Sequence, residues 1–161
     1  LLDGTYEGWY AVNRGRLVWP TMTVSGNATW GDPNATLDEV NSVRMTNWVG
    51  LTSGTLQGAL LAADNPGVIP GLISPVGVWE FTPGTLAFGS VGIAFRYDAV
   101  RAAALGVDES QLKVFRGKTG WQRLNAVVNT NTHTIVASGV TALDQFAVAL
   151  DATSGTTIII R

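Results

Sequence analysis

The single histidine, His133, is the side chain in this sequence best suited to proton transfer near neutral pH. Any catalytic triad or histidine-based metal site would have to use it. It stands between Thr132 and Thr134, where we expect a strand to begin. The sequence contains no Gly-x-Ser-x-Gly, no phosphate-binding loop and no His-Glu-x-x-His motif, which are patterns that common enzyme classes require. We therefore predict that the protein is not an enzyme and has no catalytic residue.

Adjacent carboxylates occur at two places, Asp38-Glu39 and Asp108-Glu109. A glycosidase needs two carboxylates about 5–10 Å apart, whereas neighbours on a strand point to opposite faces and neighbours in a turn face water. Asp98, Asp108 and Glu109 could offer oxygen ligands to a hard cation, but they lack the alternating spacing of a calcium loop. The chain has no cysteine, which excludes thiolate metal sites. We expect no metal and no cofactor.

Tryptophan is frequent for a chain of this size, with six residues. Two or three tryptophans exposed on a flat sheet could stack against sugar rings, as in carbohydrate-binding modules, whereas buried ones fill the core. We expect Trp79 and Trp121 in the core and Trp30 and Trp48 at the surface. One functional hypothesis is therefore a carbohydrate-binding or adhesive module that holds a polysaccharide with Trp30 and Trp48.

The C-terminal residues Thr156, Thr157, Ile158, Ile159 and Ile160 are all β-branched, which strongly favours a strand. They follow a short connector, residues 151–155. The isoleucines would make both faces of that strand apolar, and an open edge of that kind promotes aggregation. We expect the strand to be sheltered, either as the last strand of its own domain or by strand addition to a neighbouring molecule. A linker into a further domain is the third alternative.

The composition is apolar and weakly charged: of 161 residues, 46% are hydrophobic and 14% are charged. Such a chain has enough apolar side chain to fold as one domain. The net charge of −2 argues against nucleic acid as a partner, and no apolar run reaches the roughly 18–20 residues of a membrane span. A surface of Thr, Ser, Asn and Gly indicates an extracellular or cell-surface location. Asn27 and Asn34 begin N-x-Thr sequons, which are either turn residues or glycosylation acceptors.

Glycine and proline, 19 and 6 residues, are spread through the chain, and the segments between them alternate in polarity. That pattern indicates short antiparallel strands joined by turns. Residues 55–63 form either a strand or a short helix, and the prolines make residues 65–75 a loop. We predict strands at residues 5–12, 16–19, 21–25, 43–49, 76–81, 91–97, 111–116, 121–124, 133–138 and 145–150.

The same alternation predicts side-chain directions. A turn at residues 117–120 should bring Phe115 and Trp121 together across a hairpin. Asp98 should cap one short helix, which ends at Gly106. Two strands should each place four side chains on one face: Val43, Met45, Asn47 and Val49 in the first, and Val91, Ile93, Phe95 and Tyr97 in the second.

Several segments of residues 79–150 follow one another in a characteristic order. They are Phe81-Thr82-Pro83-Gly84, Ile93-Ala94-Phe95-Arg96-Tyr97-Asp98, residues 105–115, Gly120-Trp121-Gln122-Arg123-Leu124, residues 128–137 and residues 143–148. Together they resemble the ZU5-like β-sandwich modules of large bacterial surface and secreted proteins. The resemblance implies a structural or interaction unit with no shared catalytic residues. The first 75 residues resemble no family.

The sequence therefore predicts an all-β protein, an antiparallel β-sandwich of about ten short strands with one short helix near residues 98–105. Residues 1–150 form this single domain, and residues 151–161 form a connector and a C-terminal strand. We expect a non-catalytic extracellular subunit that polymerises into a filament or surface layer through Thr156–Ile160. Its partner would be a second copy or a neighbouring domain of the same protein.

Overall fold

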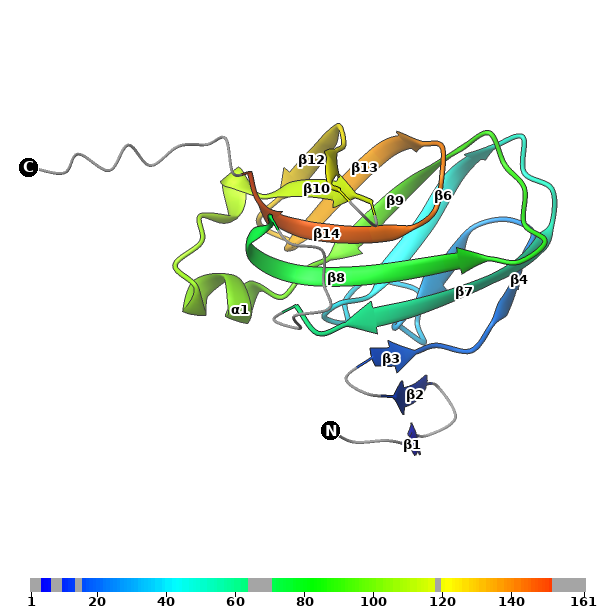
Figure 1. The fold of residues 1–161 in the computed structure, drawn as a ribbon, viewed down its shortest axis with the longest axis horizontal. Coiled ribbons are helices and arrows are strands. Elements are labelled where there is room, and N and C mark those ends of the chain that lie inside the picture. Colours follow the sequence, from blue (N-terminus) through cyan, green and yellow to red (C-terminus); the bar gives the residue numbers. More distant parts are fainter. Residues whose placement is uncertain (1–3, 7–9, 14–15, 64–70, 118–119, 152–161) are drawn as a thin grey trace, which may run out of the picture.

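Two antiparallel β-sheets pack face to face in the computed structural model, which describes residues 4–6, 10–13, 16–63, 71–117 and 120–151 (Figure 1). One short α-helix lies at one end of the sandwich. The predicted all-β sandwich with a single short helix is confirmed, with more strands than the predicted number of about ten.

Among the described residues, the larger sheet has nine strands: eight follow the order β1-β2-β3-β7-β8-β14-β10-β11, and β4 pairs with β7 beside β3. Every pairing in this sheet is antiparallel. Its strands are β1 (Gly4–Tyr6), β2 (Tyr10–Asn13), β3 (Arg16–Val18), β4 (Met22–Val24), β7 (Gly54–Leu61), β8 (Ile73–Pro83), β10 (Lys113–Arg116), β11 (Gln122–Arg123) and β14 (Gln145–Leu150).

The smaller sheet has five strands in the order β12-β13-β9-β6-β5 and is also antiparallel. In sequence, α1 (Ala99–Ala104) and a short 3-10 helix, η1 (Glu109–Gln111), connect β9 of this sheet to β10 of the larger sheet. The strands of this sheet are β5 (Ala28–Trp30), β6 (Val43–Val49), β9 (Ser90–Arg96), β12 (Ala126–Asn129) and β13 (Thr134–Val140).

Aromatic rings connect the two sheets through the middle of the core. Trp30 lies edge-on to Phe81 at 5.2 Å between ring centroids, and Phe81 lies 6.3 Å from Phe146. Phe95 of the smaller sheet contacts both Phe146, at 5.6 Å, and Trp79, at 4.9 Å. Each such pair contributes about 0.5–1.5 kcal/mol beyond the apolar area it buries. These aromatic contacts therefore join the two sheets in the most deeply buried part of the core.

Two predictions about local structure are confirmed. Alternation along β9 buries Val91, Ile93, Phe95 and the following Tyr97 on the core side. The helix α1 begins after Asp98, whose carboxylate accepts a hydrogen bond from Arg101 N at 2.9 Å. It ends before Gly106, which has a φ of 66° and so adopts the left-handed conformation that glycine allows.

The predicted side-chain directions of β6 are wrong after Thr46. Val43 and Met45 are buried as expected, but the register with β9 shifts between Thr46 and Val49. Asn47 has a φ of 54° at this β-bulge. Because a bulge inserts one residue, the faces exchange. Val49 is therefore 61% exposed, and Trp48 packs against the core.

Several predicted boundaries are also wrong. Residues 5–12 are not one strand, because β1 pairs antiparallel with β2 and Tyr6 lies opposite Tyr10. The sequence between the two strands contains Gly8, a residue type that is common in chain reversals. The β2–β3 hairpin is confirmed. Of the predicted loop at 65–75, residues 65–70 lie outside the described residues. The end of the prediction is wrong, because β8 begins at Ile73 and its register with β14 shifts near that end, where a proline is tolerated. Residues 55–63, left open between strand and helix, fall mainly in β7.

The predicted reversal at residues 117–120 does not place Phe115 directly opposite Trp121. In the β10–β11 pairing, Phe115 lies opposite Arg123, and Arg116 lies opposite Gln122. Trp121 is therefore two residues away from the position opposite Phe115. Alternation predicts which face each side chain takes, but the number of residues in the reversal sets which residues lie opposite each other.

Candidate functional site

The outer side of β12 is an open sheet edge, which we call the β12 edge. β12 pairs with β13 on one side, and no strand among the described residues pairs with the other. Its residues, Ala126–Asn129, include no charge and no proline, and their register with β13 is unbroken. An edge strand presents unpaired backbone N–H and C=O groups, which form a template for another strand.

Two valines are exposed beside this edge. Val127 is 74% exposed, and Val136, which lies directly opposite it on β13, is 40% exposed. The alternate residues of β12, Ala126 and Val128, pack against the core. β12 is thus held in the sandwich by one face and offers an apolar surface on the other.

The turn between β12 and β13 is held by hydrogen bonds within it. The Asn129 side-chain oxygen accepts hydrogen bonds from Asn131 N at 3.1 Å and from Thr132 N at 3.3 Å. The next residue, His133, has a φ of 49°, which is unusual for a residue other than glycine and costs on the order of 1 kcal/mol or more. Contacts around His133 must therefore hold the turn in this conformation.

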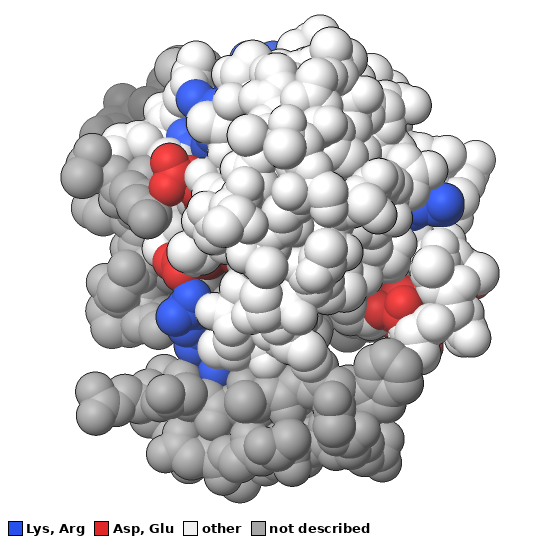
Figure 2. Space-filling model, turned by 90° about the vertical axis from the view of Figure 1, so that its right-hand side faces the viewer, with Lys and Arg blue, Asp and Glu red and all other residues white. Residues whose placement is uncertain are grey.

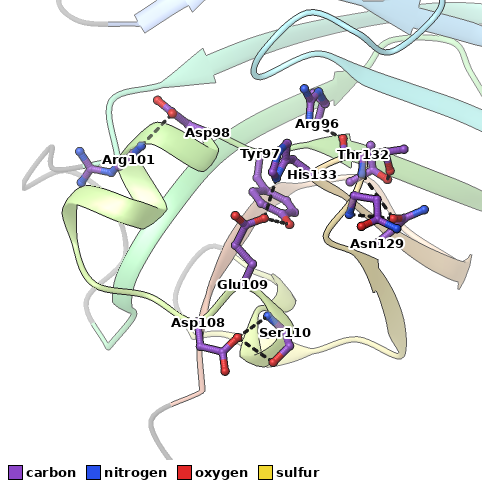
Figure 3. A network of polar contacts seen from close by, with 12 residues as sticks. Arg96, Tyr97, Asp98, Arg101, Asp108, Glu109, Ser110, Asn129, Thr132 and His133 are labelled. Atoms are coloured by element: carbon purple, nitrogen blue, oxygen red, sulfur yellow. Dashed lines mark hydrogen bonds and ion pairs between the residues drawn. The ribbon is translucent and has the colours of Figure 1, made fainter.

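Those contacts converge on one carboxylate oxygen (Figure 3). Glu109 Oε2 accepts a hydrogen bond from Tyr97 Oη at 2.5 Å and lies 2.7 Å from His133 Nδ1. We call Tyr97, Glu109 and His133 the Glu109 cluster. Its three members are far apart in sequence but meet at the end of the sandwich that carries η1 and the β12–β13 turn.

Each member of the Glu109 cluster is positioned by a different element. Tyr97 follows β9 and is completely buried. Glu109 begins η1, which is capped by Asp108: its carboxylate accepts hydrogen bonds from Ser110 N at 3.0 Å and Ser110 Oγ at 2.7 Å. His133 directly precedes β13 and is partly exposed. The cluster therefore joins a buried strand end, a capped turn and a surface hairpin.

The burial and the hydrogen bonds set the protonation of the cluster. Burial, together with the hydrogen bond to Glu109 and its negative charge, raises the pKa of Tyr97 well above its usual value. Burial by itself would raise the pKa of Glu109 as well. The hydrogen bonds from Tyr97 and His133 and the nearby positive charges outweigh it, so the pKa of Glu109 lies below its usual value. At neutral pH, tyrosine is therefore the donor and glutamate the charged acceptor.

Two further bonds attach the turn to β9. Arg96 Nη1 donates a hydrogen bond to the carbonyl oxygen of Thr132, and Tyr97 N donates to the carbonyl oxygen of His133 at 3.1 Å. The nearby hydroxyls have partners of their own, since the Thr132 and Thr134 hydroxyls lie 2.8 Å apart. The contacts described here fix the position of the hairpin and present no activated nucleophile.

The two tryptophans predicted to be exposed have different environments. Trp30 is only 2% exposed, so its predicted exposure is wrong: its position in β5 directs it into the core, edge-on to Phe81. Trp48 is half-buried and lies edge-on to Phe88 at 5.3 Å. Trp79 is in the core as predicted, whereas Trp121 is half-buried and lies outside the core cluster.

The adjacent carboxylates do not act as pairs. Asp108 caps η1 while Glu109 joins its cluster, and Asp98 caps α1. Asp38 and Glu39 are exposed. In the part of the chain that the structure describes, no three histidine, aspartate, glutamate or cysteine side chains gather as a metal site would need. The predicted assembly strand, Thr156–Ile160, lies outside the described residues.

A buried carboxylate that the sequence analysis did not select is Asp32, which is 6% exposed. It accepts hydrogen bonds from Asn34 N at 2.8 Å, Asp38 N at 2.9 Å and the Thr36 hydroxyl at 3.1 Å. Burial opposes its charge, but these hydrogen bonds outweigh burial and lower the pKa of Asp32. The Asp-Pro-Asn sequence, typical of turns, was the available signal. Asp32 organises the loop before β6.

Comparisons of the chain with protein-family models, with curated proteins and with solved structures found no match. Among the described residues, no helix has the length and apolar character needed to cross a membrane.

Proposed function

We propose that this protein is a non-catalytic, extracellular or cell-surface structural module of the ZU5-like kind. In this proposal it assembles into a filament or surface layer by donating Thr156–Ile160 as a strand to a neighbouring copy or domain. The order of segments in residues 79–150 supports the family assignment. The proposal rests chiefly on the position of the last described strand.

That strand, β14, is paired on both sides, with β8 and with β10. A strand that follows it in sequence therefore finds no free place next to it. The core is also already filled by described residues: Phe146 and Val148 of β14 are completely buried among the aromatic rings. The three isoleucines of the C-terminal segment need shelter elsewhere, and a neighbouring molecule supplies it.

The charge distribution supports contact with other proteins. Among the described residues, Figure 2 shows one end of the sandwich almost without charged side chains, with Lys, Arg, Asp and Glu near the rim of that view. The sequence explains this, because no Lys, Arg, Asp or Glu occurs in residues 45–63 or 81–95, which include the β6–β7 and β8–β9 connections. An uncharged surface loses little hydration when a partner covers it.

Strand addition would supply enough free energy for assembly. Each main-chain hydrogen bond contributes about 0.5–1.5 kcal/mol net, and each buried isoleucine about 1.5–3 kcal/mol. These gains must exceed the cost of lost translation, rotation and side-chain freedom. Repeated head-to-tail contacts of this kind do not close and so extend into a filament or layer.

Removing the donated strand tests this proposal. Deletion of residues 156–161 should convert the assembled protein to monomers with an unchanged circular dichroism spectrum, measured with light scattering and electron microscopy. Ile159→Asp should do the same, because a charge replaces a buried methyl-rich side chain, whereas Ile159→Val should assemble normally. Assembly of the deletion variant to the same size as the full chain would contradict the proposal.

The second candidate function is polysaccharide binding, and Trp48 is the residue that favours it. Trp48 is half-buried near the uncharged end of the sandwich, so part of its ring is exposed to stack against a sugar ring. Trp48→Ala should then reduce retention on immobilised polysaccharide, with Trp48→Phe as the control that preserves the aromatic ring.

A further inference from the structure

We infer that the β12 edge is the acceptor for Thr156–Ile160 of a second copy of this chain. This inference rests on the proposed function and adds the receiving surface to it. It follows from a comparison of the open edges among the described residues and from the match between the two segments.

The β12 edge is the best acceptor among the sheet edges. β11 has only two residues, both polar and exposed, and its Arg123 is paired with Asp151 at 3.0 Å. β1, β4 and β5 are each only three residues long, and Pro20 closely precedes β4. β12 has four residues in unbroken register and none of the charges, prolines or bulges that normally block an edge.

The two faces of the β12 edge match the two faces of the proposed donor. A strand added beside β12 alternates its side chains between the outer surface and the inner side. On the outer surface it would lie next to Val127, and on the inner side next to Ala126 and Val128. Ile158, Ile159 and Ile160 place apolar side chains on both faces. A donor that is apolar on both faces therefore fits an acceptor that is apolar on both faces.

The Glu109 cluster would keep this acceptor in place. It fixes the turn at one end of β12 through Glu109 and His133, and Arg96 holds the carbonyl of Thr132. A strand that is already positioned loses less conformational entropy when a partner pairs with it.

The donor comes from a second copy in this inference because the proposed function is assembly between copies, and β12 and β14 belong to different sheets. The connector at residues 151–155 spans at most about 17 Å when fully extended, which is longer than the roughly 10 Å between packed sheets. Ten residues follow the last described residue, Asp151, and five of them are the β-branched donor. Return of this segment to its own β12 edge is the alternative that the experiment must separate.

Cysteine cross-linking tests the acceptor directly, because the chain contains no cysteine of its own. A full chain with Val127→Cys is mixed with a full chain of different mass carrying Ile159→Cys, in a thiol–disulfide buffer. The expected result is enrichment of the mixed disulfide dimer over both homodimers. The matched control replaces Val127→Cys with Val100→Cys, since Val100 is 80% exposed and lies on α1, which belongs to neither sheet. The control should give no enrichment.

A chain carrying both Val127→Cys and Ile159→Cys separates the alternatives. A disulfide that closes within single chains, without the mixed dimer, would overturn the inference, because the tail would then cover its own edge. Absence of enrichment over the Val100→Cys control would also overturn it.

The tail deletion distinguishes this failure from failure of the proposed function. If deletion abolishes assembly but the cross-link is absent, strand donation stands and the acceptor lies elsewhere. If deletion leaves assembly intact, the proposed function fails, and the acceptor role fails with it.

Discussion

β11 and β12 follow each other in the chain and each ends one sheet, but their edges are protected differently. β11 is two residues long and polar, and an ion pair ties it to the end of β14. β12 is longer and uncharged, and Val127 is 74% exposed beside its free side. Short, charged edges prevent unwanted pairing. The molecule therefore blocks one of two neighbouring edges and leaves the other able to pair.

The contacts that fix these two edges also differ in burial. The Arg123 side chain in the β11 ion pair is 55% exposed, so water and salt screen its attraction to Asp151. The β12–β13 turn is fixed through Glu109, whose partner Tyr97 is completely buried. Removing the hydrogen-bond partner of a buried group lowers the free energy of unfolding more than removing an exposed ion pair does. The open edge is thus the more firmly positioned one, which suits an acceptor.

Glu109→Ala should have the largest effect on this difference. It leaves the Tyr97 hydroxyl buried without an acceptor and frees His133, so we expect a loss of about 1–3 kcal/mol in the free energy of unfolding. Urea denaturation measures this loss. Glu39→Ala, which removes an exposed carboxylate, is the control and should change stability by less than about 0.5 kcal/mol. Equal effects of the two substitutions would contradict the role of Glu109.

The contribution of Glu109 to the free energy of unfolding should also depend on pH. This pH effect should be no larger than the loss caused by Glu109→Ala. Its pKa in the folded protein is lowered from the usual 4.5, so the folded state favours the carboxylate. The stabilisation is therefore complete above pH 4.5 and is lost as pH falls through the lower folded pKa. Tyr97, His133 and Arg96 are the groups that face this carboxylate.

Denaturation of the native chain and of Glu109→Gln across pH 3 to 7 measures this dependence. The difference between them should be constant near neutrality and should shrink in acid. A difference that persists unchanged to pH 3 would show that the carboxylate charge contributes nothing to the turn.

The sequence predicted the parts of this molecule that local patterns determine. The alternation of β9 and the capped helix after Asp98 follow from neighbouring residues alone. The bulge at Asn47 depends on how β6 pairs with β9, so alternation predicted the wrong face for Trp48. The burial of Trp30 depends on Phe81 in the opposite sheet. Neither partner is visible in the local sequence.

The candidate site was predictable only in part for the same reason. His133 was identifiable as the single histidine, but its partners Tyr97 and Glu109 come from other segments, and only the fold joins them. In the sequence, the valines of β12 stand among polar residues that are typical of turns. Their exposure beside an open edge depends on the strand order of the whole sheet.

Asp151→Asn should have the smallest effect, because it weakens an exposed ion pair at the blocked edge. We expect a loss of about 0–1 kcal/mol, as for other ion pairs at protein surfaces, and the loss should shrink further in high salt. Thermal denaturation at low and high salt measures it. Assembly should remain unchanged, because Arg123 and Gln122 still make β11 short and polar. A loss of unfolding free energy as large as that of Glu109→Ala would mean that the contacts at both edges stabilise the fold equally. Burial of those contacts would then not explain why only one edge is left open.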